Sequence, residues 1–223
     1  MKLLLENWRK YLNELDAAFH GKGMSPNQMR VDPQCGTPPN DNQWEAGEAG
    51  CPQFTNHRGI NFEHEDVVEA KQFLDNVQPD HLFAYSRGGA MAIAALNNGA
   101  SHVPKITFIA PAWNRGWINE LDPNINVQGS IIHGTMDQWV PLRQSMELAL
   151  KSGLPLYIFP NADHGGQILK QKNNPTSGIL MTPEMMTKGL RVLPDWGQGE
   201  QPGNSDEVKK QHEEIIKIIK EKK

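Results

Sequence analysis

Hydrophobic positions along the chain follow two patterns, which alternate from about residue 63 onward. One is a short, uninterrupted apolar run, which is typical of a strand buried on both faces of a sheet. The other places apolar residues three and four positions apart, as on one face of an amphipathic helix. The predicted strands are the runs 81–85, 105–110, 129–134 and 154–159. The predicted helices cover 2–15, 63–77, 88–98, 141–152 and 204–220.

Residues at the ends of these segments support the assignments. Gly99 and Gly153 directly follow predicted helices, where glycine tolerates the left-handed backbone of a helix end. Pro141 stands in a first helical turn, and Asn204 or Ser205 can cap the last helix. Strands that alternate with helices predict parallel pairing and a sheet covered on both faces. The predicted fold class is therefore α/β, with a mostly parallel β-sheet flanked by helices.

The first third of the chain is less regular. The triplet 17–19 is a candidate short strand, and residues 32–60 have loop composition. A weak strand is possible near 54–62. We expect residues 1–14 to form an N-terminal amphipathic helix and residues 15–223 to fold as a single domain, which agrees with the usual size of domains.

Charge and composition narrow the range of functions. The 223 residues carry a formal net charge of -4, whereas a nucleic-acid-binding surface would be basic. No apolar run approaches the length of a membrane span, and the N-terminal leucines are too few for a secretory signal. We therefore expect a cytoplasmic protein with no nucleic-acid partner. Cys35 and Cys51 either pair or remain free thiols, and neither has the spacing of a metal ligand.

The stretch Ala84-Tyr85-Ser86-Arg87-Gly88 joins a predicted strand to a predicted helix without a loop. So sharp a turn strains the corner residue and brings two backbones close together, which requires small neighbours. Ala84 and Gly88 meet that requirement. The turn would expose the hydroxyl of Ser86 at the carboxyl edge of the sheet, beside the N-terminus of the next helix.

Two further polar residues follow strands at the same edge. Asp137 comes shortly after the strand 129–134, and His164 comes shortly after the strand 154–159. A serine hydroxyl becomes an effective nucleophile when an imidazole takes its proton, and a carboxylate fixes the tautomer of that imidazole. Ser86, Asp137 and His164 are therefore candidates for a triad.

The chain resembles an α/β-hydrolase over roughly 62–166. The corner matches the G-x-S-x-G nucleophile elbow with alanine in place of the first glycine, and residues 133–141 resemble the H-G-x-x-D-x-x-V-P stretch of small esterases, acyl-thioesterases and related peptidases. The resemblance implies a compact α/β-hydrolase fold without the family's first strands and without a lid domain. It also implies that Ser86 is the nucleophile, His164 the general base and then acid, and Asp137 the residue that orients it.

The same resemblance implies an oxyanion hole. The backbone N–H of Arg87 would be one donor. The second would be the N–H of Lys22 or Gly21, because His20-Gly21-Lys22 matches a His-Gly loop that often carries the donor in this family. The Arg87 side chain could bind a substrate carboxylate or a nearby acidic side chain.

Other positions near this edge carry two interpretations. Trp113, Trp139 and Tyr85 are candidate substrate-binding residues, although a tryptophan is equally a large core residue. Asp137 could instead cap the helix that follows it, and Asp163 could supply the acid in its place. His164 could be an ordinary loop histidine. The segment 32–60 is a candidate cover for the site.

The N-terminal segment resembles leaders found on proteins of T4-like tailed phages. Such helical leaders can direct a protein into the prohead and are cut after a Leu/Ile-x-Glu triplet, which Leu12-Asn13-Glu14 fits. This resemblance implies a phage-encoded, virion-associated protein. The alternative is a plain amphipathic helix that docks on the sheet.

The leading hypothesis is a serine hydrolase that cleaves a small-molecule carboxylic ester or thioester through an acyl-enzyme, with no metal or organic cofactor. One rival is a serine peptidase with the same triad. A second is a non-catalytic protein of α/β-hydrolase fold that serves as a virion or interaction module.

Overall fold

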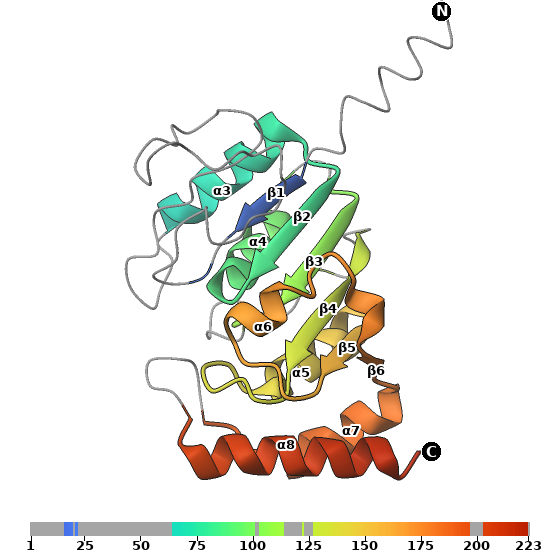
Figure 1. Ribbon diagram of the computed structural model, residues 1–223. Coiled ribbons are helices and arrows are strands. Elements are labelled where there is room, and N and C mark those ends of the chain that lie inside the picture. Colours follow the sequence, from blue (N-terminus) through green and yellow to red (C-terminus); the bar gives the residue numbers. More distant parts are fainter. Residues whose placement is uncertain are drawn as a thin grey trace, which may run out of the picture.

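A mixed β-sheet forms the centre of the molecule (Figure 1). The computed structural model describes residues 16–19, 21, 64–100, 103–113, 122, 127–196 and 203–222. The strands within this part are β1 (Asp16–Phe19), β2 (His81–Tyr85), β3 (Lys105–Ile109), β4 (Gln128–Gly134), β5 (Leu156–Phe159) and β6 (Ile179–Leu180). Their order in space is their order along the chain. Strands β1 to β5 are parallel, and β6 is antiparallel to β5.

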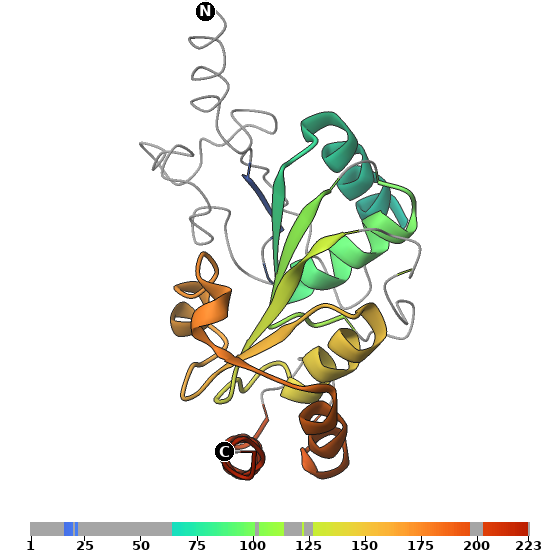
Figure 2. The same cartoon turned by 90° about the vertical axis from the view of Figure 1, so that its right-hand side faces the viewer.

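Helices cover the sheet unequally on its two faces. They are α3 (His64–Val77), α4 (Arg87–Asn97), α5 (Leu142–Ser152), α6 (Gly166–Leu169), the 3-10 turn η1 (Pro175–Ser177), α7 (Pro183–Val192) and α8 (Ser205–Lys220). Figure 2 shows α3, α4 and α5 on one face and the short α6 on the other. Helix α7 packs on α5, and α8 packs on α7. No helix in the described ranges is long and apolar enough to cross a membrane.

The core lies on both faces of the sheet, because successive strand residues point in opposite directions. Phe108 and Ile131 belong to the larger cluster, beneath α4 and α5, together with Met91 of α4. Their chain neighbours Ile109 and Ile132 belong to the smaller cluster on the face of α6. All four strand residues are fully buried. This burial explains the uninterrupted apolar runs in the sequence.

The predicted fold class is confirmed, and the predicted strands lie within two residues of those observed. Three helix-end signals are confirmed as well, whereas Pro141 is the extended N-cap of α5 and not part of its first turn. Gly99 and Gly153 have φ of 78° and 74° after α4 and α5. Asn204 caps α8 through a capping box with Glu207. Predictions for the N-terminal helix, the leader triplet, both cysteines, the weak strand near 54–62 and the segment 32–60 concern residues outside the described ranges.

The region 165–192 holds elements that the hydrophobic pattern did not predict. They are α6, η1, β6 and α7, of which only α7 exceeds four residues. Helix α7 does carry a start signal, because the Thr182 side chain accepts a hydrogen bond from the Met185 N–H and Pro183 occupies the first turn. Met185 and Met186 form part of its buried face.

Candidate active site

Ser86 forms the corner between β2 and α4 and has an unusual backbone conformation, with φ 52° and ψ −118°. Such a conformation costs about 1–3 kcal/mol in a residue other than glycine. Backbone hydrogen bonds on both sides hold it in place. The Ser86 N–H donates to the carbonyl of Ile109 over 2.9 Å, and its own carbonyl accepts the N–H groups of Gly89 and Ala112 over 3.0 and 2.9 Å. The end of β3 thus fixes the corner that follows β2.

Gly88 allows α4 to start beside β1. A Cβ on this residue would lie 2.1 Å from the carbonyl oxygen of Phe19, which no side chain could accommodate. A Cβ on Gly89 would approach the Pro111 side chain to 2.7 Å. The small residue expected two positions after the serine is therefore required by the backbone of the neighbouring strand.

His164 lies within hydrogen-bonding distance of the corner hydroxyl. Its Nε2 is 3.0 Å from Ser86 Oγ. Ser86 is 8% exposed, and the His164 side chain is 12% exposed, so both remain reachable from solvent. A neutral imidazole in this position can accept the hydroxyl proton.

Asp137 completes the chain of hydrogen bonds from the other side of the imidazole. Its Oδ2 is 2.5 Å from Nδ1 of His164. Its Oδ1 accepts the backbone N–H groups of Trp139 and Val140, each over 2.8 Å. Burial alone would raise the pKa of this carboxyl, but the charge of His164 and hydrogen bonds from His133 and His164 outweigh burial and hold its pKa below the usual range. The carboxylate is therefore ionised at neutral pH.

A second imidazole, that of His133, also contacts the Asp137 carboxylate. Its Nε2 lies 3.3 Å from Asp137 Oδ2 and 3.1 Å from the carbonyl of Val140. Its Nδ1 is 2.7 Å from the hydroxyl of Ser145 on α5. Since the side chains of His133 and Asp137 are both fully buried, the imidazole is a structural partner of the acid and has no access to a substrate.

The alternative roles of the two aspartates are resolved by their contacts. Helix α5 begins at Leu142 and has no side-chain cap, so Asp137 does not cap it. Asp163 accepts the N–H groups of Gly165 and Gln167 at the start of α6, over 3.2 and 3.1 Å. Asp163 therefore holds the turn that follows His164, while Asp137 contacts the imidazole.

Part of the expected oxyanion loop lies close to Ser86. Gly21 is buried, and a Cβ on it would be 2.9 Å from the Tyr85 ring and 3.0 Å from Ser86 Cβ. Arg87 is the first residue of α4, and its side chain is buried. Lys22 and His20 lie outside the described ranges. The structure thus brings Gly21 beside the corner, and the donor roles of Arg87, Gly21 and Lys22 remain predictions.

Tyr85 is not arranged as a substrate contact. It is 3% exposed, and its hydroxyl donates a hydrogen bond to the backbone carbonyl of His164. Its ring centroid lies 5.0 Å from that of the imidazole. Burial, and then the charges of Asp137 and Asp163, raise the pKa of this hydroxyl, which keeps it protonated as a donor. Its contacts position the histidine segment, which corrects the expectation of substrate binding.

The two tryptophans differ in their surroundings. Trp113 is 1% exposed and donates its indole N–H to the carbonyl of Gln144 over 2.7 Å. It lies in the large core cluster, so the core interpretation replaces the expected substrate contact. Trp139 is 38% exposed on the segment that carries Asp137, and it stays a candidate for substrate binding.

Comparisons with known proteins point to the same fold. No family model matches the chain, and no curated protein matches it. A structure described as a YdeN-like hydrolase from Pectobacterium atrosepticum is similar with a TM-score of 0.51 and 13% identity, over 79% of this chain and 98% of that one. A predicted CIB-like hydrolase from Thermoplasma acidophilum is similar with a TM-score of 0.50 and 20% identity, over 73% of this chain and 80% of that one. An alpha-beta serine hydrolase homologue from Coxiella burnetii has a TM-score of 0.44 and 13% identity, over 72% of this chain and 83% of that one.

The first two similarities extend over most of both chains, although the sequences have diverged widely. Together with the parallel order of β1 to β5 and the helices on both faces, they show that this chain has the α/β-hydrolase fold. At such low identity the similarity concerns the fold alone.

Proposed function

We propose that the protein is a serine hydrolase that cleaves a carboxylic ester or thioester through an acyl-enzyme. The observation that carries the proposal is the unbroken chain of hydrogen bonds from Ser86 Oγ through His164 to Asp137, with distances of 3.0 and 2.5 Å. These groups come from three segments that are distant in sequence. The hydrolase descriptions of the two similar structures agree with this class of reaction.

In the proposed reaction, His164 Nε2 takes the proton of Ser86 as Oγ bonds to the substrate carbonyl carbon. The negative charge on the carbonyl oxygen would be stabilised by the N–H of Arg87, which begins α4, and by the segment at Gly21. The imidazolium then gives its proton to the departing alcohol or thiol as the C–O or C–S bond breaks. A water molecule, activated by the same imidazole, releases the acid and restores the hydroxyl.

Each residue has a role that follows from its contacts. Asp137 cannot turn away from the imidazole, because its second oxygen is held by two backbone N–H groups. It therefore keeps the proton of the neutral imidazole on Nδ1 and leaves Nε2 free to act as a base. Trp139 would contact the acyl or leaving group at the rim, as the exposed aromatic side chain on the segment of the acid.

Labelling with a fluorophosphonate probe tests the proposal. We expect one covalent adduct on Ser86, detected by mass spectrometry of the intact chain and of its peptides. Ser86→Ala should remove the adduct, whereas Ser177→Ala, which changes an exposed serine of η1, should retain it. Failure of the wild-type protein to react, or undiminished labelling of Ser86→Ala, would contradict the proposal.

A second measurement is needed to tell whether the protein cleaves esters, thioesters or amides. A panel of p-nitrophenyl esters, thioesters and aminoacyl amides should show turnover of the esters or thioesters at rates well above those of the amides. Amide cleavage at comparable rates would identify a peptidase with the same triad. Absence of both labelling and turnover would favour a non-catalytic module of this fold.

A further inference from the structure

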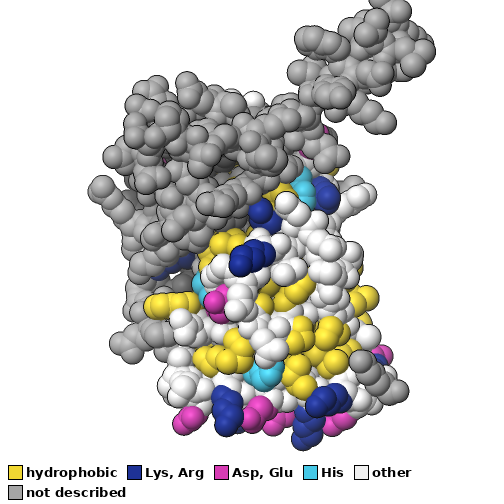
Figure 3. Space-filling model, viewed as in Figure 1, with side chains coloured by type: hydrophobic (Ala, Val, Ile, Leu, Met, Phe, Trp, Pro, Cys, Tyr) yellow, Lys and Arg dark blue, Asp and Glu magenta, His cyan; other side chains and the backbone are white. Residues whose placement is uncertain are grey.

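Helix α8 carries one polar residue in the middle of its buried face. That face consists of Val208, Gln211, Ile215, Ile218 and Ile219. Gln211 is 0% exposed. Burial of a side-chain amide is unfavourable unless hydrogen bonds replace those it made with water. Figure 3 shows acidic and basic side chains alternating over α8, at the lower edge of the molecule, so the buried amide contrasts with a charged outer surface.

The amide of Gln211 spans the segment that carries Asp137. Its Oε1 accepts the N–H of Leu142 over 2.7 Å, at the start of α5. Its Nε2 donates to the carbonyls of Thr135 and Asp137 over 3.1 and 3.4 Å. One side chain thus contacts both ends of the segment 135–142 and the backbone of the acid itself.

The next residue of α8 reaches the histidine segment through a shared hydroxyl. His212 Nδ1 lies 2.8 Å from Thr135 Oγ1, and the same Oγ1 accepts the N–H of Asn161 over 2.9 Å. Asn161 lies three residues before His164. Because the Asn161 N–H already donates to this oxygen, the Thr135 proton is free to bond to His212 Nδ1. Thr135 therefore joins α8 to the segments of both the acid and the base.

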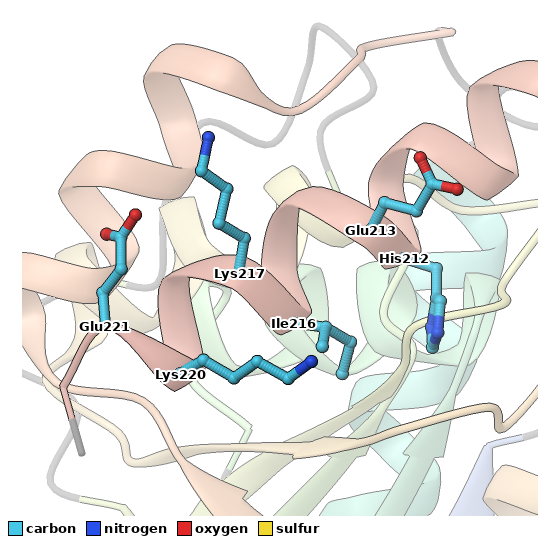
Figure 4. Close-up of a pocket in the computed structure, with 6 residues that line it drawn as sticks. All are labelled: His212, Glu213, Ile216, Lys217, Lys220 and Glu221. Atoms are coloured by element: carbon cyan, nitrogen blue, oxygen red, sulfur yellow. The ribbon is translucent and has the colours of Figure 1, made fainter.

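The outer side of this contact is open. A groove of about 490 Å³ along α8 is lined, within the described part of the chain, by His212, Glu213, Ile216, Lys217, Lys220 and Glu221. In Figure 4, His212 and Lys220 lie on one side of the helix, and Glu213 and Lys217 on the other. His212 is half-buried, so a substitution there changes one contact at the edge of the core.

We propose that Gln211 and His212 are positioning residues, through which α8 sets the distance between Asp137 and the imidazole of His164. This inference rests on the proposed hydrolase function. The acid and histidine segments also contact each other directly, because the N–H groups of Thr135 and Met136 donate to Phe159 and Ala162 over 3.1 and 2.9 Å. Helix α8 adds the hydrogen bonds of Gln211 and His212 to this direct contact between the two segments.

The first test replaces Gln211 by methionine, which has similar length and no hydrogen-bonding amide. We expect kcat for p-nitrophenyl acetate, and the rate of fluorophosphonate labelling, to fall about 10-fold to 100-fold, since displacements near 1 Å have effects of this size. The KM should change by less than about 2-fold, because the substituted side chain does not touch the substrate. Ile215→Val is the matched control, since Ile215 is equally buried one turn further along and should leave both rates unchanged.

The second test uses conservative pairs at the shared hydroxyl. Thr135→Ser keeps the hydroxyl and should retain the labelling rate, whereas Thr135→Val removes it and should slow labelling. His212→Asn places a polar atom near the position of Nδ1 and should rescue the loss caused by His212→Ala. Equal rates within each pair would overturn the role of the Thr135–His212 contact. If Gln211→Met does not fold, the variants at Thr135 and His212 still test whether α8 positions the acid and histidine segments.

A spectroscopic readout separates failure of this inference from failure of the hydrolase proposal. Proton NMR should resolve the Nδ1 proton of His164 that is shared with Asp137, and Gln211→Met should shift or broaden it while Ile215→Val does not. A wild-type protein that does not react with the probe would contradict the hydrolase, whatever the state of α8. A reactive wild type, with Gln211→Met unchanged in both rate and resonance, would overturn the role of α8.

Discussion

The hydroxyl of Tyr85 donates a hydrogen bond to the backbone carbonyl of His164. The residue that precedes the corner serine therefore holds the segment that presents the imidazole. The two rings also lie close, with centroids 5.0 Å apart. The serine and the histidine are thus linked twice, once through their reactive atoms and once through this neighbouring side chain.

Tyr85→Phe tests that link. The variant keeps the ring but leaves the His164 carbonyl without its donor, so we expect a loss of about 1 kcal/mol in the free energy of unfolding. Labelling by a fluorophosphonate should slow about 10-fold, because the imidazole is less well fixed. Tyr157→Phe is the control, as it removes the hydroxyl of a half-buried tyrosine on β5. Equal labelling rates for the two variants would show that the tyrosine only fills space.

Asp137→Asn should abolish most of the activity while preserving the shape of the site. An amide cannot hold the imidazole proton on Nδ1, and we expect kcat to fall on the order of 10³- to 10⁴-fold. Asp163→Asn is the matched control: its side-chain oxygen can still accept the N–H groups of Gly165 and Gln167, so kcat should stay within about 2-fold. Steady-state kinetics with an activated ester measures both. A larger fall in kcat for Asp163→Asn than for Asp137→Asn would indicate that Asp163, and not Asp137, orients His164.

The buried imidazole of His81 should make the free energy of unfolding depend on pH. Burial, and then the positive charge of Lys105, lower its pKa from 6.5 to about 4, and its Nε2 lies 2.8 Å from Thr107 Oγ1. Between these pH values the unfolded chain binds a proton that the folded chain does not, so stability should fall as the pH drops from about 6.5 to 4. The effect is at most about 3 kcal/mol.

The variant His81→Gln keeps a polar group near Thr107 but does not titrate. Its urea unfolding free energy should therefore vary less between pH 6.5 and 4 than that of the wild type. Parallel curves for the two proteins over this range would show that His81 titrates normally in the folded state.

Gly88→Ala should prevent the fold from forming as observed. The added methyl group would stand 2.1 Å from the Phe19 carbonyl oxygen, and relief of that clash requires moving β1 or α4. We expect a loss of more than about 3 kcal/mol, or no folded protein. Gly166→Ala is the control, because nothing lies within 4 Å of the added carbon. Comparable denaturation midpoints for both variants would contradict the close approach of β1 to α4.

The order of elements could be predicted because each carries a local signal. Strands β2 to β5 are buried on both faces and appear as apolar runs, and the ends of α4, α5 and α8 carry Gly99, Gly153 and Asn204. By contrast, β6 has two residues and α6 four, which is too short for any periodicity. Thr182 and Pro183 are residues typical of a helix start, and they could have predicted α7 where the hydrophobic pattern alone did not.

For the site, the sharp corner at Ser86, the strand ends before Asp137 and His164, and the family resemblance together pointed to three residues that the structure brings within hydrogen-bonding distance. The surroundings of the aromatic residues could not be predicted. In a sheet covered on both faces, nothing in the sequence tells which side Tyr85 faces, and the burial of Trp113 after the end of β3 has no local signal either. The contact of Gln211 with the acid segment is also unpredictable, because a glutamine in a charged helix looks like an ordinary surface residue.

Among the strands that the structure describes, each pairs with the one that precedes it along the chain, so the order in space follows the order of synthesis. A nascent polypeptide that has left the ribosome as far as β4 contains the strands β1 to β4 and Ser86, but not His164, the proposed base. The histidine arrives only after β5, and α8 follows last. Under the proposed mechanism, reactivity would therefore require residues that follow the first four strands along the chain.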